Sequence, residues 1–163
     1  MLWIAAAAGV VMILPGWLLA QPWPFTPPPV MSAPNNSMAQ QNALRSVQSQ
    51  VNWFQNSIRT ASGYQTGAYG NVWQQFQILR GAYGAFTGTL TPQQLDRGAN
   101  ELAELNAGLD ILQEAFTDYQ QAVADGQSSA SAFNNMCQVL YQASGVWLQE
   151  LNSVSNRLHV GWR

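Results

Sequence analysis

The chain of 163 residues has no lysine, and only 9% of its residues are charged. All six basic residues are arginine, and eight acidic residues bring the formal net charge to -2. Neutralised phosphates supply most of the affinity for DNA and RNA, so an acidic chain without a basic cluster is not expected to bind nucleic acid. Abundant Gln, Asn and Ser must make the surface wettable in place of charge.

The chain has one cysteine, Cys137, and one histidine, His159. A lone cysteine excludes an intramolecular disulfide, so helix packing has to hold the fold together. A Ser/His/Asp or Cys/His triad lacks partners and zinc lacks ligands, because His159 lies in the C-terminal tail, far from Cys137. We therefore expect no enzymatic activity, no cofactor and no metal site, and we expect Cys137 to be an inert, buried thiol.

The absence of lysine also bears on the glycine-rich stretch LRGAYGAFTG. A phosphate-binding loop follows a strand and places a lysine after its glycines, and this stretch has neither feature. We expect instead that Gly81 and Gly84 loosen the end of a helix and that Gly88 ends it. Tyr83 and Phe86 are expected to point toward the core.

Residues 1–20 are mostly apolar, with an unbroken run from Leu2 to Leu14 followed by Pro15 and Gly16. A short apolar run, a helix break and a small residue at position 20 are typical of a cleaved secretory signal. The competing interpretation is an uncleaved membrane anchor, because the segment is just long enough to span a bilayer. We favour cleavage, and both interpretations place the body of the protein outside the cytoplasm.

Residues 21–37, QPWPFTPPPVMSAPNNS, are dense in proline, which fixes φ and removes backbone donors. They predict an extended arm that acts as a spacer before a helical domain of residues 38–163. Trp23 and Phe25 give the arm a second interpretation, since two exposed aromatic rings on a stiff segment can dock in a groove of a partner.

The apolar residues of the first half of the domain recur at alternating spacings of three and four, over residues 44–58 and again over 69–86. Each series forms one face of a helix. Gly63 and Gly67 lie between the two series. The second series is therefore a separate helix or a continuation of the first after a kink.

The sequence TPQQ predicts the start of the next helix, because Thr91 can cap it and Gln94 occupies the capping-box position. The apolar stripe then continues as one long helix to the stop signal at residues 125–126. A last helix opens at Ser128 or Ser129 and pairs with it as an antiparallel hairpin. The predicted fold is all-α: an elongated antiparallel bundle of three or four helices with an extended proline-rich N-terminal arm.

Seven of the eight acidic residues lie within residues 96–125. Asp110, Glu114 and Asp118 recur every fourth residue, which predicts a solvated acidic stripe along one helix, facing arginines of neighbouring helices. Cation binding by this stripe stays open, although no EF-hand spacing supports it.

Three tryptophans fall within the predicted helices. Trp53 and Trp73 each lie next to a residue of the apolar stripe, and Trp147 lies on it. All three are expected at the flank or in the core of the bundle. The alternative is an apolar contact surface for a neighbouring subunit, where tryptophan is favoured.

The order of these features resembles the minor-pilin family of type IV secretion and conjugative transfer systems: a secretory signal, a Gln-rich first helical region, LRGAYGAFTG and a long helical hairpin. In that family a helix commonly ends in a Tyr-x-Ala-x-Thr-Gly-like phrase, to which Tyr83-Gly84-Ala85-Phe86-Thr87-Gly88 is similar. The similarity in layout extends over residues 40 to 160.

The resemblance implies an exported, non-enzymatic minor pilus component, located in the periplasm or on the pilus. Such a protein contacts the major pilin and an inner-membrane platform protein, and homo-oligomerisation is compatible with this role. The phrase would then be a helix-to-loop joint at the end that contacts partners. Its candidate partner contacts are Tyr83, Gly84, Phe86 and Gly88.

The sequence is compatible with two other functions. The first is a small accessory subunit of an inner-membrane complex, held by an uncleaved helix within residues 1–20. The second is a periplasmic helical binding or chaperone module that uses the apolar seam of the bundle. A cavity along the bundle axis would favour the second.

Overall fold

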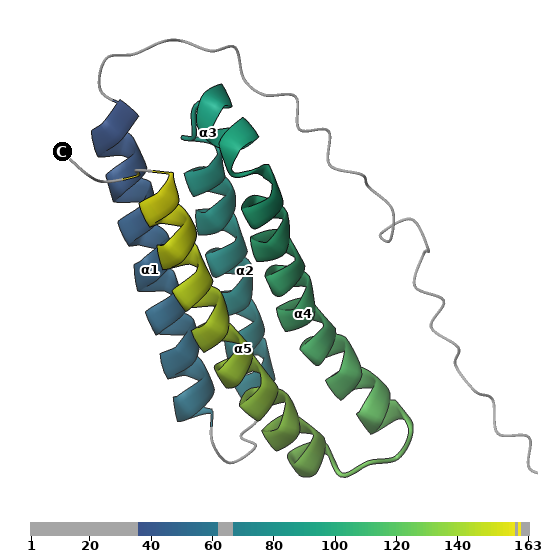
Figure 1. Ribbon diagram of the computed structural model, residues 1–163. Coiled ribbons are helices and arrows are strands. Elements are labelled where there is room, and N and C mark those ends of the chain that lie inside the picture. Colours follow the sequence, from purple (N-terminus) through teal and green to yellow (C-terminus); the bar gives the residue numbers. More distant parts are fainter. Residues whose placement is uncertain (1–35, 62–66, 159, 161–163) are drawn as a thin grey trace, which may run out of the picture. The chain divides into compact units, whose positions relative to one another are not determined.

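The computed structural model describes residues 36–61, 67–158 and 160 of the chain. These residues form five α-helices and no strand, which confirms the prediction of an all-α helical bundle (Figure 1). The helices are α1 (Asn36–Thr60), α2 (Ala68–Thr87), α3 (Pro92–Arg97), α4 (Ala99–Ala124) and α5 (Ser129–Arg157).

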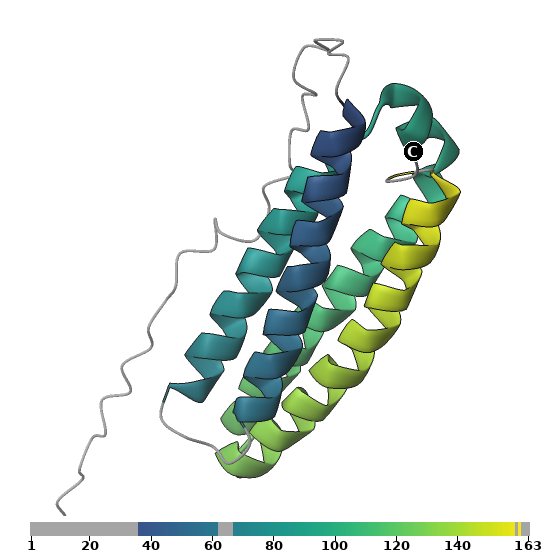
Figure 2. The same ribbon diagram turned by 90° about the vertical axis from the view of Figure 1, so that its left-hand side faces the viewer.

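The four long helices run antiparallel to their sequence neighbours and form two hairpins, α1 with α2 and α4 with α5. Each hairpin is tightly packed within itself, and α1 also packs along α5. Figure 2 shows the α1–α2 pair on one side of the bundle and the α4–α5 pair on the other. Short α3 lies at the end of the bundle where α1 begins and α5 ends (Figure 1).

Aromatic rings fill the space between α2 and α4. The ring of Trp73 meets that of Phe116 edge-on at a centroid distance of 4.9 Å, and Tyr69 stacks on Tyr119 at 5.1 Å. Phe76 lies 5.4 Å from Phe116 and joins the same cluster. Side chains of this size bury large apolar areas, so α2 and α4 are held together by their rings rather than by close approach of their backbones.

The apolar stripes expected from the sequence form the core. On α1 the buried positions are spaced by three and four, as one helical face requires. Burying each of these side chains contributes roughly 1.5–3 kcal/mol, which offsets the entropy of ordering the chain. The buried hydrophobic residues of α1 and α2 are Leu44, Val47, Val51, Phe54, Ile58, Val72, Phe76, Leu79, Tyr83 and Phe86.

The prediction of one long helix after Thr91 is wrong, because the chain breaks at Gly98 into α3 and α4. The capping box itself is present: the Thr91 hydroxyl accepts from the Gln94 backbone N–H, and the Gln94 side chain accepts from the Thr91 N–H. A Cβ on Gly98 would lie 3.0 Å from a methyl of Leu158. The break at Gly98 therefore lies where the end of α5 packs against the chain.

The prediction that Gly81 and Gly84 loosen a helix is also wrong. Both residues lie within α2, which continues to Thr87 and is capped by Gly88. A Cβ on Gly81 or Gly84 would meet nothing within 4 Å, so neither packing nor a left-handed φ requires glycine at these two positions. The expected end at Gly88 is confirmed.

A group of hydrogen bonds joins the ends of four elements at the α3 end of the bundle. The Gln40 amide on α1 donates to the Thr89 carbonyl at 2.8 Å and to Oε1 of Gln94 at 2.9 Å. The Gln94 amide donates to the carbonyl of Leu158, which follows α5, at 3.1 Å. We call Gln40, Thr89, Gln94 and Leu158 the glutamine clasp.

The predicted segment 1–20 and residues 21–35 of the predicted arm 21–37 lie outside the described residues, together with Trp23 and Phe25. The helical domain begins at Asn36, two residues before the predicted boundary at 38. Within the described residues, no helix is both long enough and apolar enough to cross a membrane.

Candidate interaction surfaces

The Tyr83–Gly88 joint is built from two buried side chains and two exposed glycines. Phe86 is fully buried, and Tyr83 lies in the core with its ring 5.4 Å from that of Trp147. The Tyr83 hydroxyl donates to the Leu102 carbonyl at 3.4 Å, and burial raises the pKa of Tyr83 well above its usual range. The side chains of Tyr83 and Phe86 are thus packed in the core and are not available at the surface, whereas Gly84 and Gly88 are exposed.

The three helical tryptophans have different environments. Trp147 is 2% exposed, and its Nε1 donates to the Leu105 carbonyl at 2.7 Å. Trp73 is half-buried in the aromatic cluster between α2 and α4. Trp53 is 60% exposed, which makes it the tryptophan available for contacts with a partner. An exposed indole of this size is costly to leave in water and is favoured at protein interfaces.

Trp53 belongs to an exposed stripe along α1. Met38, Arg45, Ser49 and Trp53 follow one another at spacings of seven and four, which keep them on one side of the helix, away from the buried stripe. Met38 is 68% exposed, and Arg45 and Ser49 are also exposed. We call these four residues the α1 stripe.

A second exposed apolar surface lies where α4 and α5 run side by side. Ile111 is 53% exposed on α4, and Val139 and Val146 are 39% and 64% exposed on α5. The bond from Trp147 to Leu105 sets the antiparallel register, so Ile111 lies at a level between the two valines. We call these three residues, with Glu104 and Asp118, the α4–α5 face.

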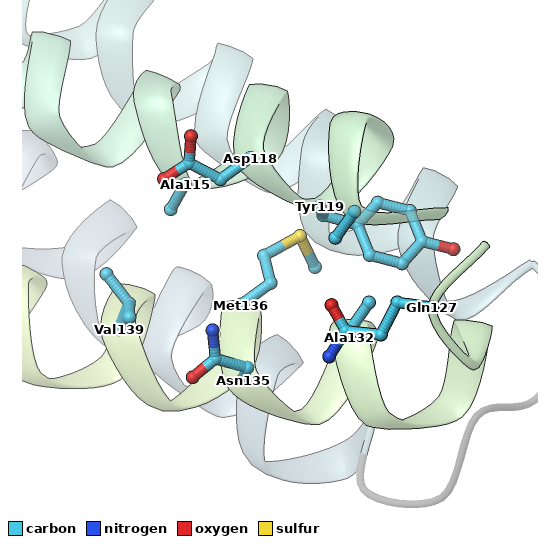
Figure 3. Close-up of a pocket in the computed structure, with 9 residues that line it drawn as sticks. Ala115, Asp118, Tyr119, Gln127, Ala132, Asn135, Met136 and Val139 are labelled. Carbon is cyan, nitrogen blue, oxygen red and sulfur yellow. The ribbon is translucent and has the colours of Figure 1, made fainter. Parts of the chain in front are cut away.

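A pocket of about 50 Å³ opens at the edge of this face (Figure 3). Val139 and Asn135 line it from α5, and Ala115 and Asp118 line it from α4. The volume is enough for water and too small for an organic ligand. The pocket is therefore a small hollow at the edge of the α4–α5 face.

Charge is segregated between the two hairpins. Helices α1 and α2 contain three arginines and no acidic residue, whereas α4 and α5 contain six acidic residues and one arginine, Arg157. Arg157 pairs with Glu101 at 2.9 Å. Arg59 donates to the Tyr141 hydroxyl of α5, and Arg80 donates to the Gln113 side chain of α4, next to Glu114 of the predicted acidic stripe. The acidic stripe of α4 is solvent-exposed at Asp110, Glu114 and Asp118.

Cys137 is half-buried rather than fully buried, because Met136 occupies the inward position next to it. The thiol lies in an open groove of about 430 Å³ between the end of α1 and the first half of α5, near Arg59 and Tyr141. Partial burial raises the pKa of Cys137 to about 11, which lowers its thiolate fraction at neutral pH.

Within the described helices and loops, no group of three or more His, Cys, Asp or Glu side chains could hold a metal ion. His159 lies outside the described residues. Neither pocket runs along the bundle axis, because both open at its surface between neighbouring helices. No protein-family model, curated protein or solved structure matches the chain.

Proposed function

We propose that the protein is an exported, non-enzymatic assembly protein that serves as a minor pilus component of a type IV secretion or conjugation apparatus. The observation that carries the interaction role is the pair of exposed surfaces, the α1 stripe and the α4–α5 face, on a bundle with a filled core. The apparatus itself is proposed from the order of sequence features and the Tyr83–Gly88 phrase.

The core supports a role as a rigid building block. Its largest fully buried side chains are aromatic or branched, and no buried side-chain polar atom of the described residues lacks a hydrogen-bond partner. A bundle packed in this way presents its surface residues in fixed positions, which lowers the entropy cost of binding a partner. The proposed partners are the major pilin and an inner-membrane platform protein.

The first test is intact mass and N-terminal sequencing of the protein from membrane, periplasmic and sheared-pilus fractions of its host. The proposal expects a product that begins near residue 21 and is recovered with sheared pili. A deletion strain should lose substrate transfer and regain it with the wild-type gene. Unchanged transfer and unchanged pili in the deletion strain would refute the pilus role.

A second candidate function rests on the apolar run of residues 2–14. We propose as the alternative an accessory subunit of an inner-membrane complex, anchored by an uncleaved N-terminal helix. The same measurement separates the two functions, because an anchored subunit keeps Met1 and stays in the membrane fraction. Co-purification with an integral membrane complex would then replace the pilus assignment.

A further inference from the structure

The α1 stripe and the α4–α5 face are complementary in charge. Arg45 is exposed on the stripe, and the hairpin that carries it contains no acidic residue. Glu104 and Asp118 flank Ile111 on the α4–α5 face, and the arginine of that hairpin, Arg157, is already paired with Glu101. Each surface therefore carries charge that the same hairpin leaves unneutralised.

The two surfaces also agree in spacing. Glu104 and Asp118 each lie seven residues from Ile111, which is about 10 Å along a helix. Arg45 lies eight residues from Trp53, or about 12 Å. If the Trp53 indole packs on Ile111, Arg45 reaches the level of one of the two carboxylates, whichever way the helices run.

We propose that a second copy of this chain occupies the α4–α5 face with its α1 stripe. Trp53 packs against Ile111, Val139 and Val146, and Arg45 pairs with Glu104 or Asp118. The contact removes an exposed indole and three exposed branched side chains from water, and it brings the unneutralised charges of the two hairpins together.

The proposed contact is heterologous, because it joins two different surfaces. The two surfaces belong to different hairpins, which lie on opposite sides of the bundle (Figure 2). Each copy that docks through one surface keeps the other free for a further copy. Such contacts produce rings when the rotation closes and open filaments when it does not.

The association is expected to be weak and dependent on concentration. Few large apolar side chains contribute, and stable interfaces bury about 1,200–2,000 Å² in total. Removal of a central tryptophan should weaken the association roughly 10-fold or more. Added salt should weaken it as well, because the pairs of Arg45 with Glu104 or Asp118 are solvent-accessible.

The decisive experiment mixes two variants, each of which lacks one surface. The stripe variant carries Arg45→Glu and Trp53→Ser, and the face variant carries Ile111→Ser and Val146→Ser. Sedimentation of the isolated protein at increasing concentration should show association of the wild type and monomers for either variant alone. A 1:1 mixture should form dimers, because one intact stripe meets one intact face.

A wild type that stays monomeric at every concentration overturns the proposal. A mixture that stays monomeric while the wild type associates overturns it too, because copies then pair through other surfaces. The matched control carries Arg97→Glu and Leu95→Ser on α3, where the same types of exposed side chain lie outside both surfaces. It should associate like the wild type, and circular dichroism should show the same helicity for every variant.

Charge reversal provides a test that leaves the apolar residues unchanged. Arg45→Glu alone and the pair Glu104→Arg with Asp118→Arg should each lose association. A 1:1 mixture of these two proteins should regain it. A photo-crosslinker at position 53 in the host should join to residues of α4 or α5 in a second copy. Crosslinks that reach only another protein would assign the stripe to a different partner and overturn the proposal.

Discussion

The replacement of Gly108 by alanine is the sharpest test of how the α4–α5 hairpin packs. A Cβ at position 108 would lie 2.6 Å from Cδ1 of Trp147, whereas carbon atoms in contact prefer about 3.5–4.0 Å. The indole cannot yield freely, because it is 2% exposed and donates to the Leu105 carbonyl. We expect the added methyl group to force the helices apart or to break this hydrogen bond.

The expected change in the free energy of unfolding is the sum of two opposing contributions. Alanine is favoured over glycine inside a helix by about 1 kcal/mol, whereas overpacking a core costs about 1–3 kcal/mol. Gly81→Ala isolates the first term, because a Cβ at position 81 of α2 would meet nothing within 4 Å. Gly81→Ala should therefore stabilise the protein. Gly108→Ala should be less stable than Gly81→Ala by roughly 1–3 kcal/mol.

Urea unfolding followed by helical circular dichroism measures both variants on the same scale. A third protein with Trp147→Leu will be much less stable, but adding Gly108→Ala to it should cost nothing, because the ring is gone. That non-additivity separates a clash with Trp147 from a general effect on α4. Equal stability of Gly108→Ala and Gly81→Ala would refute the close approach of Gly108 and Trp147.

Three further predictions concern single polar groups. Gln94→Ala should destabilise the protein by about 1–3 kcal/mol in urea unfolding, because buried groups of the glutamine clasp lose their partner. Burial raises the pKa of Tyr83, so its contribution to stability is complete below the unfolded value of 10.0 and is lost as pH rises through the folded value. Tyr83→Phe should flatten the fall in stability as pH rises above about 10, and an unchanged slope would contradict this assignment. Alkylation of Cys137 should reach half its maximal rate near pH 11 in the folded protein, and Cys137→Ser should abolish it.

The helices that the sequence predicts correctly are those specified by local patterns. The stripes of α1 and α2, the capping box at Thr91 and the start of α5 at Ser129 depend on residues within a few turns of one another. Spacings of three and four define one face whichever helix packs against it. Local signals of this kind predict that a helix exists and which face it buries.

The features that the sequence could not predict depend on residues far apart in the chain. The break at Gly98 coincides with the packing of Leu158, and the need for glycine at position 108 depends on Trp147. The sequence predicts the Gln94 side chain as half of a capping box, but this side chain also donates to the carbonyl of Leu158, 64 residues away. The spacing of apolar residues does not specify which helices become neighbours, so none of these three features follows from it.

The candidate site was predicted less well than the fold, for the same reason. Trp53 and Trp73 have the same relation to their apolar stripes in sequence. The structure leaves Trp53 exposed and packs Trp73 against Phe116. The α4–α5 face was not identified at all, because Ile111, Val139 and Val146 come together only through the register of two helices.

The positions of the side chains from Tyr83 to Gly88 give this segment a structural role in the bundle. Tyr83 and Phe86 pack in the core, and Gly88 caps α2, so the aromatic residues of the phrase meet a packing requirement of this bundle. Buried aromatic residues followed by a C-terminal glycine suit any helix that ends against the core of a bundle, whatever the protein binds. In the proposed assembly, contacts with a partner are made by exposed residues such as Trp53 and Ile111. Substitutions at those two positions should therefore impair assembly at unchanged stability, whereas substitutions at Tyr83 and Phe86 should lower stability first and assembly only in consequence.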